Sequence, residues 1–121
     1  MQVRNLNTTP KISGAGPLFT SDDVQRVPLA PDSTDFNAAV VHFGPGVRNK
    51  FHYHASDQIL VVTEGTGKVV TKAGEEVTVR VGDVVFAPAG EEHWHGALED
   101  GGAFAHITVT RKDGSVTQTE A

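Results

Sequence analysis

Cysteine is absent from this chain of 121 residues. Disulfides and thiolate metal sites are therefore excluded, and a bound metal would have to be held by histidine nitrogens and oxygen ligands. No apolar run approaches the roughly 20 residues that a membrane-spanning helix needs. The first residues, MQVRNLNTTPK, also lack the apolar core of a secretory signal. We therefore predict a cytoplasmic protein without a membrane partner.

Clusters of basic residues are missing as well. Of the ten Lys and Arg residues only Arg111 and Lys112 are adjacent, and the net charge is −5 at pH 7. A surface that binds nucleic acid needs grouped positive charge to contact phosphates. We therefore expect no nucleic-acid partner, and a small molecule is the predicted ligand.

Helical periodicity is also lacking, since no run of roughly ten residues or more repeats apolar side chains at helical spacing. Short β-rich runs separated by Gly, Pro and Asp turns predominate instead. They cover residues 38–43, 47–54, 58–64, 68–72, 76–80, 84–87, 93–98 and 103–110. This pattern predicts an all-β fold in which two sheets form a barrel or jelly roll.

The length suits one domain, which we assign to residues 1–121. Residues 1–36 are predicted to be an arm with short strands near residues 24–29, packing on a neighbouring subunit. Residues 37–112 would form the barrel, and residues 113–121 a tail that is either frayed or a short strand at a subunit interface. Because small barrels commonly associate, we predict a homodimer or homotetramer.

Histidine is the unusual component. Six are present, and five lie between residues 52 and 106. His52 and His54 are two residues apart, so in a strand they face the same side. Gln58 opens the next strand after a short turn, and His93 opens a later one. A lone strand histidine is usually a surface or packing residue, but this grouping predicts a site for a divalent metal.

Two segments of the chain resemble the two cupin motifs. Residues 46–58, GVRNKFHYHASDQ, followed by Gly65, are similar to the first motif, and residues 82–93, GDVVFAPAGEEH, to the second. The resemblance implies a double-stranded β-helix barrel, with His52, His54, Gln58 and His93 as metal ligands. This chain has Gln58 where the family usually has glutamate, and Ala97 where an asparagine often ends the second motif.

The glutamine has an electrostatic consequence. Three neutral imidazoles and a neutral amide leave the full charge of a divalent ion uncompensated, whereas a carboxylate would cancel one unit. Such an ion polarises a bound oxygen more strongly. The ligand set therefore favours Lewis-acid chemistry over dioxygen activation. Mn, Fe, Zn, Ni and Co in the divalent state all suit this ligand set.

A narrower resemblance concerns the second half of the chain. The string GDVVFAPAGEEHWHGA, the H-x-H-x-x-x-Q run and the later Ala105-His106-Ile107 are similar to small bacterial manganese cupins with (R)-hydroxynitrile lyase activity. The resemblance implies a metal-dependent lyase, with Mn as the expected metal, that cleaves cyanohydrins to an aldehyde or ketone plus cyanide. By position, His106 would be the acid/base residue, and His95 would line the pocket.

The sequence leaves the orientation of His106 open. Phe104, His106 and Thr108 share one face of the predicted strand, but the opposite face is equally apolar, so alternation does not show which face points inward.

Three other functions also remain open. An Fe(II) dioxygenase would consume O₂. A sugar-acid isomerase or tautomerase would need an inward Arg or Lys, for which Arg48, Lys50 and Arg80 are the candidates. A non-catalytic binding cupin would close the coordination sphere with protein ligands.

Overall fold

The computed structural model describes residues 1–121, and all of its regular structure is β. The eleven strands are β1 (Ile12–Ser13), β2 (Val24–Pro28), β3 (Phe36–Phe43), β4 (His52–His54), β5 (Gln58–Glu64), β6 (Thr66–Thr71), β7 (Glu76–Arg80), β8 (Val84–Ala87), β9 (His93–Ala97), β10 (Phe104–Arg111) and β11 (Val116–Gln118).

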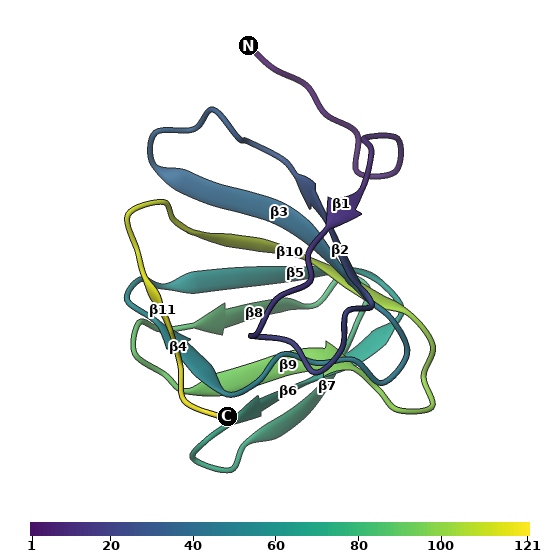
Figure 1. The fold of residues 1–121 in the computed structure, drawn as a ribbon, viewed down its shortest axis with the longest axis vertical. Coiled ribbons are helices and arrows are strands. Elements are labelled where there is room, and N and C mark those ends of the chain that lie inside the picture. Colours follow the sequence, from purple (N-terminus) through teal and green to yellow (C-terminus); the bar gives the residue numbers. More distant parts are fainter.

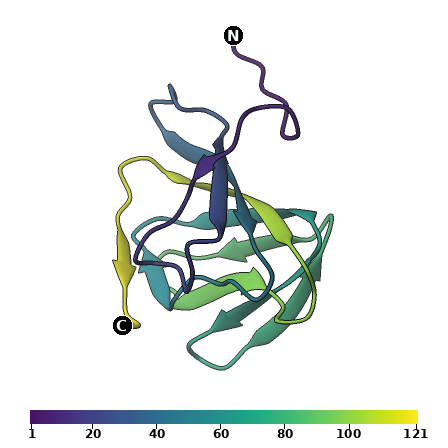
Figure 2. The ribbon, with the colours of Figure 1, turned by 45° about the vertical axis from the view of Figure 1, so that its right-hand side comes forward.

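The strands form two antiparallel sheets that face each other (Figures 1 and 2). One sheet has the order β1-β2-β3-β10-β5-β8, and the other has the order β11-β4-β9-β6-β7. The predicted all-β double-sheet barrel is therefore confirmed. The structure contains no helix long and apolar enough to cross a membrane.

One predicted strand, residues 47–54, is interrupted. Only His52–His54 is regular strand, while Arg48 makes an isolated bridge to Gly96 of β9. The pairs Arg48–Gly96 and His52–His93 differ by one residue in register, so an extra residue is accommodated between them. Bulges of this kind disturb local pairing and are common beside functional sites. Alternating apolar residues cannot reveal such an insertion.

The core lies between the sheets. Seven buried residues form one cluster: Val24, Phe43, Val47, Val62, Val79, Ala97 and Phe104. A second, smaller cluster contains Val27, Val40 and Ala105, and Leu6 and Leu29 pack against it. Strand β10 contributes to both clusters, through Phe104 and Ala105. Its two faces are thus both buried, which explains why both are apolar.

The N-terminal arm packs on the barrel of its own chain, and its expected contact with a neighbouring subunit stays a prediction. Strand β2 pairs with β3 along five residues, and β1 pairs with β2. The first residues, including Met1 and Val3, are exposed and extend away from the barrel (Figure 1).

The C-terminal segment is likewise part of the barrel. Strand β11 pairs with β4, with Val116 opposite His54 and Gln118 opposite His52. Beyond it, Glu120 accepts two hydrogen bonds from the Arg48 guanidinium, at 3.0 and 2.9 Å, and one from the Phe51 backbone N–H at 2.9 Å. The tail is therefore not frayed, because β11 pairs with β4, the strand that carries His52 and His54.

The Glu120 carboxylate predicts a pH-dependent part of the stability. The hydrogen bonds from Arg48, and next that from Phe51, lower the pKa of Glu120 from 4.5 to about 2. A depressed carboxyl pKa stabilises the fold above about pH 4.5, and this stabilisation is lost as the pH falls toward 2. Because the side chain is one-third exposed, we expect Glu120→Gln to cost about 1–2 kcal/mol at pH 7.

Urea unfolding of wild type and Glu120→Gln at several pH values tests this prediction. The difference in unfolding free energy should shrink as the pH is lowered below about 4.5. Glu75→Gln is the matched control, since Glu75 is exposed and its carboxylate makes no ion pair. A difference that stays constant across this range would contradict the assignment.

Candidate metal centre and substrate cavity

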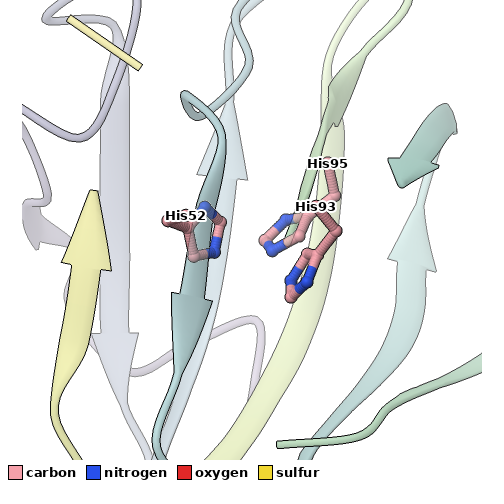
Figure 3. A group of neighbouring side chains, drawn as sticks. All are labelled: His52, His93 and His95. Carbon is pink, nitrogen blue, oxygen red and sulfur yellow. The ribbon is translucent and has the colours of Figure 1, made fainter. Parts of the chain in front are cut away.

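The histidines converge because of how their strands pair. His52 of β4 lies directly opposite His93 of β9 in an antiparallel pair. Figure 3 shows the side chain of His52 facing those of His93 and His95 from the neighbouring strand. The ring centroids of His52 and His93 are 4.7 Å apart. Residues 41 positions apart in the chain therefore share one space between the sheets.

His52, His93 and His95 form a buried group that can hold a metal ion. Each offers a ring nitrogen, and these three atoms lie within 4.8 Å of one another. All three side chains are at most 3% exposed. The sequence had predicted His52 and His93 as ligands, and it had assigned His95 only to the pocket lining.

Two of these rings are held by their own strands. Nδ1 of His52 donates to the Lys50 carbonyl at 2.7 Å, and Nδ1 of His93 donates to the Glu91 carbonyl at 2.9 Å. In a neutral imidazole, donation from Nδ1 leaves Nε2 as an acceptor. Both residues therefore present the Nε2 lone pair that a metal requires.

Gln58 adds an oxygen to the same space. Its Oε1 lies 3.0 Å from Nε2 of His93, while its amide nitrogen donates to the Thr108 hydroxyl at 3.0 Å. With Nδ1 of His93 protonated, Nε2 and Oε1 are two acceptors facing each other. Two lone pairs at this distance repel each other unless a cation lies between or beside them. This convergence fits a metal centre.

His54 completes the grouping predicted from the sequence. Its ring centroid lies 5.1 Å from that of His52 and 6.0 Å from that of His93. Its Nε2 is buried and has no hydrogen-bond partner. A buried polar atom without a partner costs free energy, and a metal bond would remove that cost. The residues present therefore fit a divalent ion.

Burial keeps these imidazoles neutral. It lowers the pKa of His52 to about 4, with further lowering by His93 and His54, and the pKa of His54 to about 4. Burial also lowers the pKa of His93. Because metal ligation needs the unprotonated ring, these sites are ready to bind a metal at pH 7 without first losing a proton.

His95 and His106 form a hydrogen-bonded pair beside the proposed ligands. Nε2 of His106 lies 2.9 Å from Nδ1 of His95. Asn49 accepts the backbone N–H of His95 through Oδ1 at 2.9 Å, and its amide nitrogen lies 3.3 and 3.4 Å from the two ring nitrogens. An amide nitrogen only donates, so one ring nitrogen of His95 accepts from Asn49. One proton is shared between Nδ1 of His95 and Nε2 of His106.

Gly96 permits this arrangement. A Cβ atom at Gly96 would lie 2.4 Å from the Arg48 Cα, so the chain before β4 could not approach β9 as closely with any larger residue. That approach places Asn49 beside His95, and the backbone N–H of Asn49 donates to the His95 carbonyl at 3.0 Å.

Four of the histidines, His52, His54, His95 and His106, line a cavity of about 150 Å³. Its lining residues are Leu18, Phe19, Val41, Phe43, Asn49, His52, His54, Gln58, His95, His106, Thr108 and Thr110. Pockets for drug-sized ligands are typically about 300–1,000 Å³, so this one suits a small molecule. A wider hollow near β7 and β8 is lined by valines, Phe86 and acidic residues, and it contains no histidine.

The structure thus brings together all six residues singled out from the sequence. It also decides the orientation of β10, because His106 and Thr108 line the cavity. Among the contributors that the sequence reasoning missed are Asn49, which holds His95, and Leu18 and Phe19 from the arm. Asn49 lies in the interrupted strand and the other two in a segment without periodicity, so no sequence pattern distinguished them.

Comparison with known proteins places this architecture in a family. The family model described as "Cupin domain" matches residues 39–110. (R)-mandelonitrile lyase from Granulicella tundricola is 36% identical over 115 residues, which covers 93% of this chain and 86% of that protein. An acireductone dioxygenase from a Synechococcus strain is 33% identical over 85 residues, or 65% of this chain and 40% of that protein.

Solved structures agree. A cupin-like protein from Thermotoga maritima has a TM-score of 0.82 at 30% identity, covering 90% of this chain and 84% of that one. The polyketide cyclase RemF from Streptomyces resistomycificus shares the fold, with a TM-score of 0.85 at 17% identity and coverage of 100% and 87%. With two facing antiparallel sheets and a buried histidine site between them, this chain belongs to the cupin family.

Proposed function

We propose that this cupin is a metal-dependent lyase that cleaves cyanohydrins into an aldehyde or ketone and cyanide. The mandelonitrile lyase relative, which matches almost the whole chain, supports this activity. The observation that carries the proposal is the cavity itself. It brings the metal-binding group and the His95–His106 pair together with an apolar wall, as a small hydroxyl-bearing substrate requires.

We assign the metal to His52, His54, Gln58 and His93. These residues offer atoms whose lone pairs are free or face another acceptor. His95, in contrast, already engages His106 and Asn49 through its ring nitrogens. A bound divalent ion, Mn²⁺ above all, would supply Lewis-acid stabilisation of the negative charge that develops on the substrate oxygen.

His106 is the acid/base residue of this proposal. Burial lowers its pKa to about 4, so the ring is neutral at pH 7 and can accept a proton. We assign the proton shared with His95 to Nε2 of His106, which leaves the lone pair on Nδ1, an atom that is buried without a hydrogen-bond partner. We assign Nδ1 to take the substrate hydroxyl proton and to return it to the departing cyanide. The hydrogen bond to His95 stabilises the imidazolium formed between these events.

The alternatives receive less support. A sugar-acid isomerase would need a cation in the cavity, but no Arg or Lys lines it. Arg48 instead contacts Glu120 and stacks on Trp94 at 4.7 Å. A dioxygenase has one relative in its favour, whose match covers less than half of that protein. The predicted cytoplasmic location and homo-oligomeric state stay predictions.

Mandelonitrile cleavage is the direct test of the lyase. We expect protein loaded with Mn²⁺ to release benzaldehyde, and His106→Ala to lose about 100-fold or more of that rate because the proton acceptor is gone. Benzaldehyde is followed by its ultraviolet absorbance in mildly acidic buffer, with uncatalysed decomposition subtracted. Release no faster than that of the variant would refute the lyase, and O₂ consumption would favour the dioxygenase.

Metal content distinguishes the two possible ligand sets. We expect His54→Ala to weaken Mn²⁺ binding by roughly 100-fold or more, since it removes a ligand. His95→Gln should bind the ion nearly as well as wild type. Calorimetric titration with Mn²⁺ and elemental analysis measure both variants. The reverse result, with metal lost from the His95 variant alone, would assign the site to His52, His93 and His95.

Thr108 should affect the metal through Gln58. Its hydroxyl accepts from the Gln58 amide nitrogen and so keeps Oε1 turned toward His93. Thr108→Val should lower Mn²⁺ affinity about tenfold, because the amide is then free to rotate. Thr108→Ser keeps the hydroxyl and should retain the affinity. Equal affinities for the two variants would show that Thr108 does not orient the ligand.

A further inference from the structure

The segment between β1 and β2 crosses the barrel opening. In Figure 1 it is the dark purple loop that passes in front of the sheets before returning to β2. Its Leu18–Thr20 portion lies beside residues 48–50, the interrupted strand that leads into β4. Leu18 and Phe19 are both partly buried, and both line the histidine cavity.

Hydrogen bonds hold this segment in place. The Lys50 backbone N–H donates to the Leu18 carbonyl at 2.7 Å, and the Thr20 N–H donates to the Arg48 carbonyl at 3.0 Å. Phe19 and Asn49 form an isolated antiparallel bridge. The Thr20 hydroxyl also accepts the Arg48 N–H at 3.2 Å. The segment therefore behaves as an added strand that is part of the cavity wall.

The cavity is lined by polar and by apolar side chains. The histidines and Gln58 are polar lining residues, and the substrate hydroxyl would lie against them. Leu18, Phe19, Val41 and Phe43 are apolar lining residues. The rings of Phe19 and Phe43 are 5.9 Å apart, and Phe43 lies 5.4 Å from His106. An apolar group on the substrate's reacting carbon would thus lie beside the acid/base histidine.

We propose that Leu18 and Phe19 are the specificity-determining residues of this site: they form the surface that contacts the carbon substituent of the substrate and favours an aromatic ring over a small alkyl group. The proposal rests on the cyanohydrin lyase function for the identity of the substrate. It assigns a role to the arm, which contributes no metal ligand and no proton-transferring group.

The proposed preference for an aromatic ring rests on its contact area with two uncharged side chains. Both side chains are apolar, so they bind the substituent equally in the ground state and the transition state. Truncating them should therefore raise KM and leave kcat nearly unchanged. A small substituent cannot reach the wall, so its KM should not change.

Leu18→Ala is the main variant, because Leu18 does not belong to either core cluster. We expect it to raise KM about tenfold for mandelonitrile and to leave KM for lactonitrile within about twofold. Phe19 also packs against the main core cluster, so the milder Phe19→Leu is used there. Leu29→Ala is the matched control, since it truncates a leucine of the same arm that packs against the other cluster.

Binding of an unreactive probe makes the test independent of turnover. The compound 1-phenylethanol keeps the ring and hydroxyl of mandelonitrile but carries a methyl group in place of the nitrile. Its Kd is measured by NMR titration of the full chain loaded with diamagnetic Zn²⁺. We expect amide shifts around residues 18–20 and 41–43, and a Kd about tenfold weaker in Leu18→Ala than in Leu29→Ala.

The outcomes separate the two proposals. The role of the arm would be overturned if Leu18→Ala changed neither the ratio of KM for mandelonitrile to KM for lactonitrile nor the Kd of 1-phenylethanol. It would also be overturned if 1-phenylethanol did not bind to wild type, whatever the lyase assay shows. Binding that depends on Leu18 without benzaldehyde release would overturn the lyase and retain the apolar wall. A raised KM for mandelonitrile but not for lactonitrile, together with a weaker affinity for 1-phenylethanol, supports both proposals.

Discussion

The structure depends on a conflict between lone pairs in its interior. Nε2 of His93 and Oε1 of Gln58 are 3.0 Å apart, while Nδ1 of His93 and the amide nitrogen of Gln58 donate elsewhere. Nε2 of His54 is a further buried polar atom without a hydrogen-bond partner. An arrangement of this kind is costly in a plain protein core, and it becomes favourable around a cation. The fold therefore holds its ligands in a binding conformation.

Segments that carry no proposed ligand stabilise that conformation. Strand β4 pairs with β9 only at His52–His93, so β11 and the Glu120–Arg48 interaction supply much of its remaining support. The extra residue before β4 lets the Lys50 carbonyl accept from Nδ1 of His52. The C-terminal segment and the interrupted strand thus stabilise the positions of the proposed ligands on β4.

Different elements contribute different kinds of residue to the cavity. Three strands of the barrel, β4, β5 and β9, supply the proposed ligands, and β10 supplies His106 and Thr108. The arm supplies an apolar wall. In the proposed function, the residues that would hold the metal are separate from those that would contact the substituent, so the substrate range could change without disturbing the metal. The neutral ligand set is consistent with Lewis-acid chemistry on a small substrate.

The sequence by itself determined the fold, and it predicted the candidate ligands. Strand alternation placed His52 and His54 on one face, and the spacing of the two motifs linked them to Gln58 and His93, because these patterns are local. Only the tertiary structure decided the rest. The inward face of β10 depended on which side the arm covered, since Ala105 is as apolar a neighbour as Phe104. Asn49, Leu18 and Phe19 belong to the site through contacts between segments distant in the chain, and such contacts leave no periodic trace in the sequence.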